Sequence, residues 1–178
     1  TYFGWVDGTF QMLSEEQIDA SILARIGNLI AWLFVPLGWG NWQATVASIT
    51  GLVAKENIVG TLGILYGGGE GTVYQNLAMH FTGITGYSFL VFNLLCAPCF
   101  AAIGAIKREM NNSKWTWFAI GYQCGFAYLI ALMVNQFGSA VTGEVNAIGL
   151  IAAAAVLVLM LYLLFRPYKE AGRLSVKR

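Results

Sequence analysis

The sequence predicts an all-α polytopic membrane protein with about five transmembrane or re-entrant helices and a cytoplasmic C-terminus. Hydrophobic residues make up 57% of the 178 residues and charged residues only 11%, whereas soluble domains carry about 25% charge. Uncharged stretches of membrane-spanning length recur along the chain, at residues 26–54, 71–106, 115–143 and 145–165. Together these observations exclude a water-soluble globule.

Charge, cysteine count and motifs exclude several other classes. The net charge is +1 without a long basic run, so nothing indicates nucleic-acid binding, and three cysteines do not form a secreted disulfide framework. The glycine run 67–71 lacks the Gly-Lys-Ser/Thr of a phosphate loop, and His80 is the sole histidine. Because the chain starts at Thr1 without a signal peptide, we expect it to be a piece of a larger protein.

The first part of the chain is predicted to hold an external segment and a helical hairpin. Residues 1–19 are acidic and amphipathic. Residues 20–66 are interpreted as a gate-like hairpin of two segments, 20–37 and 42–66, because Pro36-Leu37-Gly38-Trp39-Gly40-Asn41 is a cluster of helix breakers. The first segment is short and Pro36 ends it, so it is either a full span or a re-entrant, half-crossing segment.

The remaining elements follow from the other uncharged stretches. Residues 67–85 are predicted to form an external loop, and residues 84–138 a cysteine-bearing hairpin of two spans, 84–106 and 115–137. The last transmembrane helix is expected at 146–165, followed by a basic tail at 166–178. Eight of the ten basic residues lie in the 107–114 loop and this tail, which places both in the cytoplasm.

Lys55 and Glu56 are the first candidates for function, because charges inside a span are costly unless they are paired or face a wet cavity. Glu56 lies 15 residues beyond Asn41, about 22 Å along a helix, which predicts a deep position. The other interpretation is a helix-end pair that reaches an interface. Polar and small residues nearby are typical of an ion path or an unwound stretch of helix: Ser48, Thr50, Gly51 and Asn57.

The three cysteines are the second candidates. Cys96 and Cys99, three residues apart, are expected to share a helix face, and Pro98 should free a backbone carbonyl one turn earlier. Cys99 and Cys124 lie 8 and 10 residues from the basic loop, about 12–15 Å into the membrane. The alternative is that these cysteines are small apolar packing residues.

Two or three sulfurs with Glu56 would suit a soft or borderline metal ion such as iron(II), held weakly enough to leave. Met79 and His80, with Glu70, are candidates for capturing ions at the entrance. Two other functions fit the same residues: a membrane thiol oxidoreductase that uses Cys96 and Cys99, and a structural assembly domain. The Gly-x-x-x-Gly pair Gly121 and Gly125 indicates close packing, either within one bundle or in a homo-oligomer.

Three long motifs resemble the membrane region of the bacterial ferrous iron transport protein B (FeoB) family. They are the run from Pro36 to Glu56, the run Phe89-Leu90-Val91-Phe92-Asn93-Leu94-Leu95-Cys96-Ala97-Pro98-Cys99, and Ala102-Ile103-Gly104-Ala105-Ile106-Lys107-Arg108-Glu109. The resemblance implies a multi-pass permease that moves Fe²⁺ across the bacterial inner membrane. It also implies that residues 41–56 belong to a second gate, and that Cys96 and Cys99 line or gate the iron path.

The same resemblance implies partners that this chain does not contain. That family carries an N-terminal GTPase domain, which binds GTP and Mg²⁺, and a first gate; small cytoplasmic accessory proteins are further expected partners, besides the lipid bilayer. We therefore expect no enzyme activity from this chain itself. The gate or hinge candidates are Pro36, Gly38, Gly40, Asn41, Gly51, Lys55 and Pro98.

Overall fold

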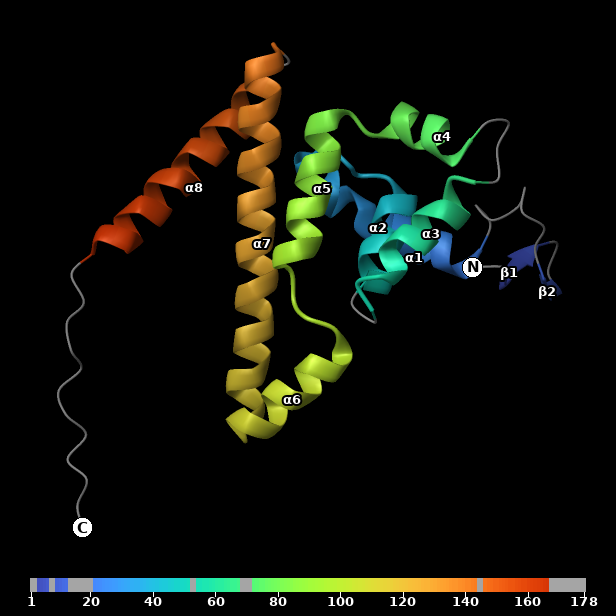
Figure 1. Ribbon diagram of the computed structural model, residues 1–178, viewed down its shortest axis with the longest axis horizontal. Coiled ribbons are helices and arrows are strands. Elements are labelled where there is room, and N and C mark those ends of the chain that lie inside the picture. The colour runs from blue at the N-terminus through green and yellow to red at the C-terminus, as the bar shows by residue number, and fades with distance from the viewer. Residues whose placement is uncertain are drawn as a thin grey trace.

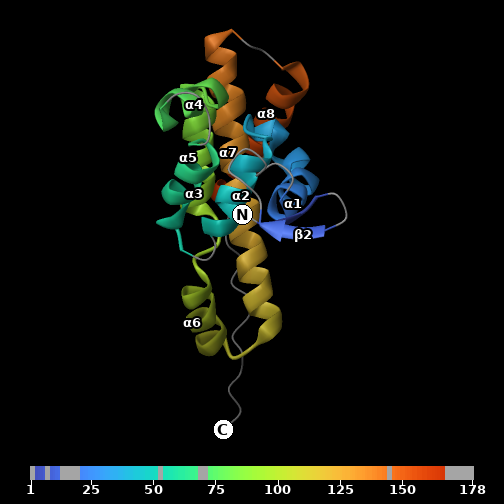
Figure 2. The same ribbon diagram turned by 90° about the vertical axis from the view of Figure 1, so that its right-hand side faces the viewer.

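The computed structural model describes residues 3–6, 9–12, 21–51, 54–67, 72–143 and 146–166. Its longest element is α7 (Ser113–Thr142), and α5 (Gly83–Leu95) packs along it. Helix α8 (Ala147–Phe165) follows one end of α7 and runs obliquely to it (Figures 1 and 2). The short N-terminal helices lie on the opposite side of the molecule from α8 (Figure 1). Helix α7 contacts both α5 and the 3₁₀ segment of the N-terminal part, residues 32–37.

A small β-hairpin, which the sequence analysis did not predict, precedes the helices. Strands β1 (Phe3–Val6) and β2 (Thr9–Met12) pair antiparallel, with Trp5 opposite Phe10. The signal was Asp7-Gly8 between the two strands, since this dipeptide favours two-residue hairpin turns. The acidic residues that suggested an external amphipathic segment lie outside the described residues: Asp7, Glu15, Glu16 and Asp19.

The first membrane segment bends sharply. Helix α1 (Ile22–Ala31) starts at Ser21, whose hydroxyl accepts from the Ala24 amide, and continues into the 3₁₀ helix η2 (Trp32–Leu37). Gly38 then adopts a left-handed conformation (φ +88°), which glycine allows without steric cost. Helix α2 (Trp42–Gly51) follows at 96° to the preceding helices. This geometry is that of a broken span or a re-entrant loop.

The single helix predicted over residues 42–66 is wrong. The structure divides it into α2 and α3 (Asn57–Leu65), and Ala54, Lys55 and Glu56 lie between the two helices outside regular helix. Gly51 ends α2 in close contact with Ile58: a Cβ at Gly51 would lie 2.6 Å from the Ile58 side chain. The deep position predicted for Glu56 assumed one straight helix from Asn41, so that prediction does not apply to this structure.

The later elements also contain breaks. Helix α4 (Val73–His80) lies in the predicted external loop and begins with a capping box formed by Thr72 and Gln75. Between α5 and α6 (Phe100–Met110) the helix is interrupted at residues 96–99. Helix α6 lies at one end of α7, and α4 lies near the opposite end (Figure 1).

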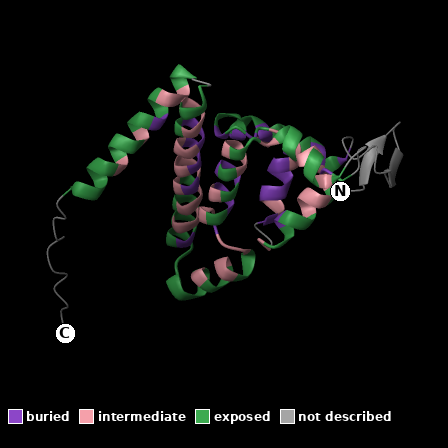
Figure 3. Ribbon diagram, turned by 45° about the horizontal axis from the view of Figure 1, so that its top comes forward, coloured by how far each residue is buried: buried purple, intermediate pink, exposed green. Residues whose placement is uncertain are grey.

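In the part of the chain that the structure describes, three stretches are long and apolar enough to cross a membrane: Gly83–Met110, Ser113–Thr142 and Ala147–Phe165. The bent pair of residues 22–37 and 42–51 would make a fourth. The prediction of an all-α polytopic membrane architecture is confirmed. Figure 3 shows buried residues on the facing sides of α2, α5 and α7, whereas α8 is mostly exposed apolar surface, as lipid contact requires.

The core is aromatic and centred on Trp39. Its ring stacks on Phe34 at 4.4 Å between centroids, and Phe89 and Phe92 of α5 contact it at 5.1 and 5.4 Å. Such offset and edge contacts add to the free energy gained by burying these large side chains. The cluster fixes the Pro36–Asn41 bend against α5.

Candidate functional site

The break between α5 and α6 surrounds the first two cysteines. Cys96 follows the last residue of α5, and Cys99 precedes the first residue of α6; both have extended backbone. The prediction that they share a helix face is therefore wrong. Pro98 lies between them and has no amide N–H, so it cannot continue the helix by bonding the carbonyl of Leu94 four residues earlier.

Lys55 satisfies the carbonyl that Pro98 leaves without a helical partner. Its Nζ donates to the Leu94 carbonyl at 3.0 Å and lies 3.5 Å from the Cys96 carbonyl. Lys55 itself lies in the break between α2 and α3. One side chain thus joins the two helix breaks, which are about 40 residues apart in the sequence.

Cys96 is paired with Cys124, not with Cys99. The Sγ atoms of Cys96 and Cys124 lie 3.4 Å apart, and both thiols are free and half-buried. Cys124 lies near the middle of α7, so this contact connects the end of α5 to that helix. Cys99 is also a free, half-buried thiol, at the start of α6 rather than in this pair.

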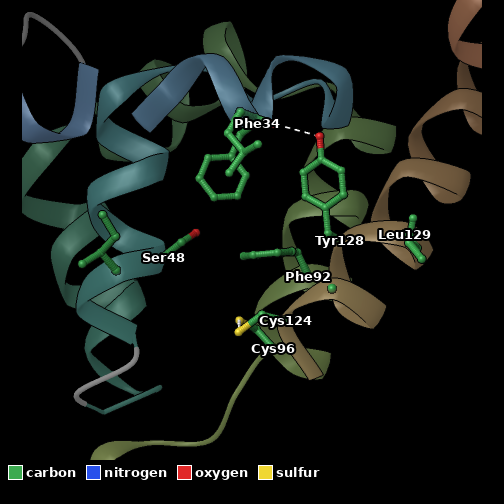
Figure 4. A pocket seen from close by; sticks show the side chains of 10 residues that line it. Phe34, Ser48, Phe92, Cys96, Cys124, Tyr128 and Leu129 are labelled. Atoms are coloured by element: carbon green, nitrogen blue, oxygen red, sulfur yellow. Dashed lines mark hydrogen bonds between the residues drawn. The ribbon is translucent and has the colours of Figure 1, made fainter. Parts of the chain in front are cut away.

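The thiol pair borders a cavity of about 570 Å³ between η2, α2, α5 and α7. Its walls are almost entirely apolar, and Figure 4 shows the two sulfur atoms side by side at one end. The hydroxyl of Ser48 is buried without a hydrogen-bond partner and points into the cavity (Figure 4). Tyr128 lines another wall and donates its hydroxyl to the Leu33 carbonyl at 2.9 Å. The cavity therefore combines apolar walls with two thiols and two hydroxyls.

Other residues predicted for the ion path lie elsewhere. Glu56 is exposed just before α3 and does not cap that helix. His80 ends α4 and contacts the ring of Tyr66 at 5.2 Å, while Met79 is 77% exposed. Glu70 lies outside the described residues. Within the described ranges, no three His, Cys, Asp or Glu side chains gather closely enough to hold a metal ion.

The predicted hinge residues hold the bend in place. The Pro36 carbonyl accepts hydrogen bonds from Asn135 (3.2 Å) and Gln136 (2.8 Å) of α7. A Cβ at Gly38 would lie 2.5 Å from the Asn135 Oδ1, and Gly40 is packed against Val35 in the same way. These glycines permit close approach between backbone segments.

Asn41 connects the start of α2 to α3. Its Oδ1 accepts from the Ala44 amide at 2.7 Å and from the Tyr66 hydroxyl at 3.1 Å. The first bond satisfies a free amide at the helix start, which is the usual role of asparagine there.

Sequence reasoning missed the two polar residues of α7 that bond the Pro36 carbonyl, Asn135 and Gln136. The available signal was Asn135-Gln136 inside an otherwise apolar span, because amides in a membrane helix are usually bonded to other protein groups. Their hydrogen-bond acceptor is the carbonyl of Pro36, in a 3₁₀ helix about 100 residues earlier. The spacing of residues in the sequence could not predict this partner.

The profile of the Gate family, described as nucleoside recognition, matches residues 10–113. The chain belongs to this family. The match extends over the elements from β2 to α6, so this gate segment contains Lys55, Cys96 and Cys99, whereas Cys124 lies beyond it.

Individual relatives agree with the predicted resemblance. The gate chain is 40% identical over 122 residues to the Fe(2+) transporter FeoB of Methanocaldococcus jannaschii, covering 68% of this chain and 18% of that protein. Over 121 residues it is 35% identical to the Fe(2+) transporter FeoB of Staphylococcus aureus strain COL, with the same coverage.

A third relative is a fusion protein. The chain is 30% identical over 138 residues to the Fe(2+) transport protein A/Fe(2+) transporter FeoB fusion protein of Porphyromonas gingivalis, covering 69% of the chain and 16% of the fusion. The chain thus spans less than a fifth of the length of these relatives. No solved structure matches it. The resemblance to FeoB proteins is confirmed.

Proposed function

We propose that this chain is the membrane permease segment of a ferrous iron uptake transporter and that it contributes to the path of Fe²⁺ across the bacterial inner membrane. The names of its relatives support the ion. The chain itself supports the route, through the contact between its two helix breaks. Fe²⁺ is the cargo of this proposed reaction, not a resident cofactor.

The observation that carries the proposal is the hydrogen bond from Lys55 to the Leu94 carbonyl. It shows that two interrupted helices meet at one point of the fold. In membranes, backbone carbonyls outside regular helix are tolerated where they are buried in protein or line a cavity, and transporters build ion sites from such interrupted helices. We therefore assign the ion path to the junction of the α2–α3 and α5–α6 breaks.

The groups at this junction can replace part of the water shell of a divalent cation. The main-chain oxygens of Leu94 and Cys96 are hard ligands, and the sulfurs of Cys96 and Cys124 are soft ones. Iron(II) accepts both kinds. A thiol loses its proton when it binds a metal, so ion occupancy should decrease as the pH falls.

Coupling to nucleotide is the second part of the proposal. In the full-length protein a GTPase domain with bound GTP and Mg²⁺ would bias the gate between closed and open states. The bend at Gly38 and the break at Pro98 are the hinges that this coupling would use. The fusion relative supports a small accessory protein as a partner, because it joins a transport protein A to a FeoB.

The test is anaerobic Fe²⁺ uptake by cells that express the full-length protein at matched membrane abundance. Cys96→Ser and Cys124→Ser should each reduce uptake at least tenfold, because each removes one sulfur from the pair. Cys99→Ser is the matched variant, since it removes a half-buried thiol outside the pair, and it should retain most of the activity. Glu56→Gln should have an intermediate effect, because Glu56 is exposed beside the break.

Normal uptake by both Cys96→Ser and Cys124→Ser would contradict the proposed path. Equal loss in all three serine variants would indicate that Cys99 joins the path in another conformation of the protein.

A second function, thiol oxidoreduction, is favoured by the short distance between the Cys96 and Cys124 sulfurs. It differs from the pair first expected, Cys96 and Cys99. Thiol–disulfide exchange needs a partner thiol or an electron acceptor that can reach the sulfurs. If this were the function, serine variants would lose dithiol oxidation while Fe²⁺ uptake stayed unchanged.

A further inference from the structure

The carboxyl end of α5 presents main-chain oxygens that no helical amide satisfies. The Leu94 carbonyl would normally accept from residue 98, which is proline and has no N–H. The Cys96 carbonyl follows the helix end, in extended backbone. Helix carboxyl ends carry a partial negative charge, so this point of the fold attracts a cation.

The group that fills this position is the ammonium of Lys55, at 3.0 Å from the Leu94 oxygen and 3.5 Å from the Cys96 oxygen. An ammonium is a compact charge on a flexible stem of four carbons. The side chain is half-buried and comes from a different helix break. It can therefore leave the carbonyls by rotation of its own bonds, without a change in α5.

We propose that the carbonyls of Leu94 and Cys96 form a cation site at the end of α5, and that Lys55 is its built-in competitor. The ammonium occupies the site when no ion is bound, and a divalent cation must displace it. Lys55 thereby sets how strongly the site holds its ion. The inference rests on the proposed transport function for the identity of the natural ion, but not for the existence of the site.

The neighbouring thiols would bind the same cation with which Lys55 competes. Cys96 supplies one carbonyl of the site, and its sulfur contacts that of Cys124. A cation bound by these sulfurs and carbonyls would lie close to the Lys55 ammonium and be repelled by it, because both carry positive charge. Displacing the lysine lowers the affinity, and a transport site needs an ion that can leave.

A purely structural role for Lys55 predicts the opposite result. If Lys55 only satisfied the Leu94 carbonyl, its removal would loosen the end of α5 and weaken any metal binding there. If Lys55 competes with the cation, removal of its charge tightens metal binding. The sign of the change in affinity therefore decides between the two roles.

The experiment measures Cd²⁺ affinity by calorimetry on the purified full-length protein without oxygen, in a Cys99→Ser background. Cd²⁺ is a thiophilic, redox-inert probe. Lys55→Met and Lys55→Gln should bind Cd²⁺ at least tenfold more tightly than the parent, and Lys55→Arg, which keeps the charge, should not. Lys55→Gln retains a donor for the Leu94 carbonyl, so it serves if Lys55→Met does not fold. Lys114→Met is the control, since Lys114 is exposed at the start of α7.

A double-mutant comparison tests the carbonyl itself. Pro98→Ala restores an amide that can bond the Leu94 oxygen, so in this background Lys55→Gln should change Cd²⁺ affinity by less than twofold. Unchanged or weaker Cd²⁺ binding by Lys55→Gln in the parent background would overturn the proposal, as would an equal gain in Lys114→Met. Because binding is read without transport, absence of Fe²⁺ uptake by the unaltered protein would contradict the proposed function and leave this test intact.

Discussion

The Sγ atoms of Cys96 and Cys124 lie 3.4 Å apart, although 28 positions separate the two residues in the sequence. Cys96 directly follows the last residue of α5 and Cys124 lies near the middle of α7, so the pair marks where the broken helix contacts the long one. Lys55 contacts the same end of α5 from the α2–α3 break. Three segments that are distant in sequence therefore meet around one pair of thiols.

Oxidation of the purified protein should link Cys96 to Cys124. Copper phenanthroline removes two electrons and two protons from the thiols, and the sulfurs need to approach from 3.4 Å to about 2.05 Å. Peptide mapping by mass spectrometry should find this disulfide in most molecules, with Cys99 still open to alkylation. Cys99→Ser should leave the link unaffected. A Cys96–Cys99 disulfide as the main product would contradict the contact between Cys96 and Cys124.

Gly38→Ala should destabilise the bend. The left-handed φ of +88° costs a non-glycine residue about 1–2 kcal/mol, and the new Cβ would press against Asn135 at 2.5 Å. A loss of about 2–4 kcal/mol is expected from both effects together, measured as thermal unfolding in detergent.

Gly104→Ala is the matched control for Gly38→Ala. Gly104 lies within α6, and nothing lies within 4 Å of a Cβ at this position. Alanine favours helix by up to about 1 kcal/mol over glycine, so this variant should be as stable as the parent or slightly more so. Equal destabilisation in both variants would mean that the bend is not specifically strained.

Ser48 and Ser88 test whether the cavity hydroxyl has a functional partner. Ser88 donates to the Ala131 carbonyl at 3.0 Å, so Ser88→Ala should cost about 1 kcal/mol. The Ser48 hydroxyl has no partner, so Ser48→Ala should be neutral or stabilising in unfolding experiments. If Ser48→Ala nevertheless slows Fe²⁺ uptake at unchanged stability, the hydroxyl contacts the ion or its water. Comparable destabilisation by both variants would contradict the cavity geometry.

The membrane architecture could be predicted because its signals are local. Long uncharged stretches and the Pro36–Asn41 breaker cluster appear directly in the sequence, and Pro98 does free a carbonyl one turn earlier. An unwound stretch near Lys55 and Glu56 was one of two interpretations of the polar and small residues there, but its bounds could not be predicted, because residues 42–66 were treated as one segment. Its charged pair Lys55-Glu56 was recognised as functional, but the lysine's partner is a main-chain oxygen, which leaves no trace in the sequence.

The grouping of the cysteines was wrong for a related reason. Spacing of three residues brings side chains together only while the helix continues, and α5 already ends at Leu95, before both Cys96 and Cys99. The contact between Cys96 and Cys124 depends on how α5 packs on α7. Tertiary packing of this kind is decided by side-chain fit over the whole interface, not by the spacing of residues along one helix.

Tyr128→Phe should loosen the bent segment of residues 22–37. The Tyr128 hydroxyl donates to the Leu33 carbonyl at 2.9 Å, which ties α7 to η2. Loss of this bond leaves a carbonyl of a 3₁₀ helix unsatisfied, at a cost of about 1 kcal/mol. Hydrogen exchange followed by mass spectrometry should show faster exchange in peptides covering residues 31–38. Tyr122→Phe is the control, because Tyr122 lies on the same helix and is 63% exposed. Hydrogen exchange of residues 31–38 in this variant should equal that of the parent. Unchanged exchange in Tyr128→Phe would show that the amides of Asn135 and Gln136, which bond the Pro36 carbonyl, hold the bend without help from the tyrosine.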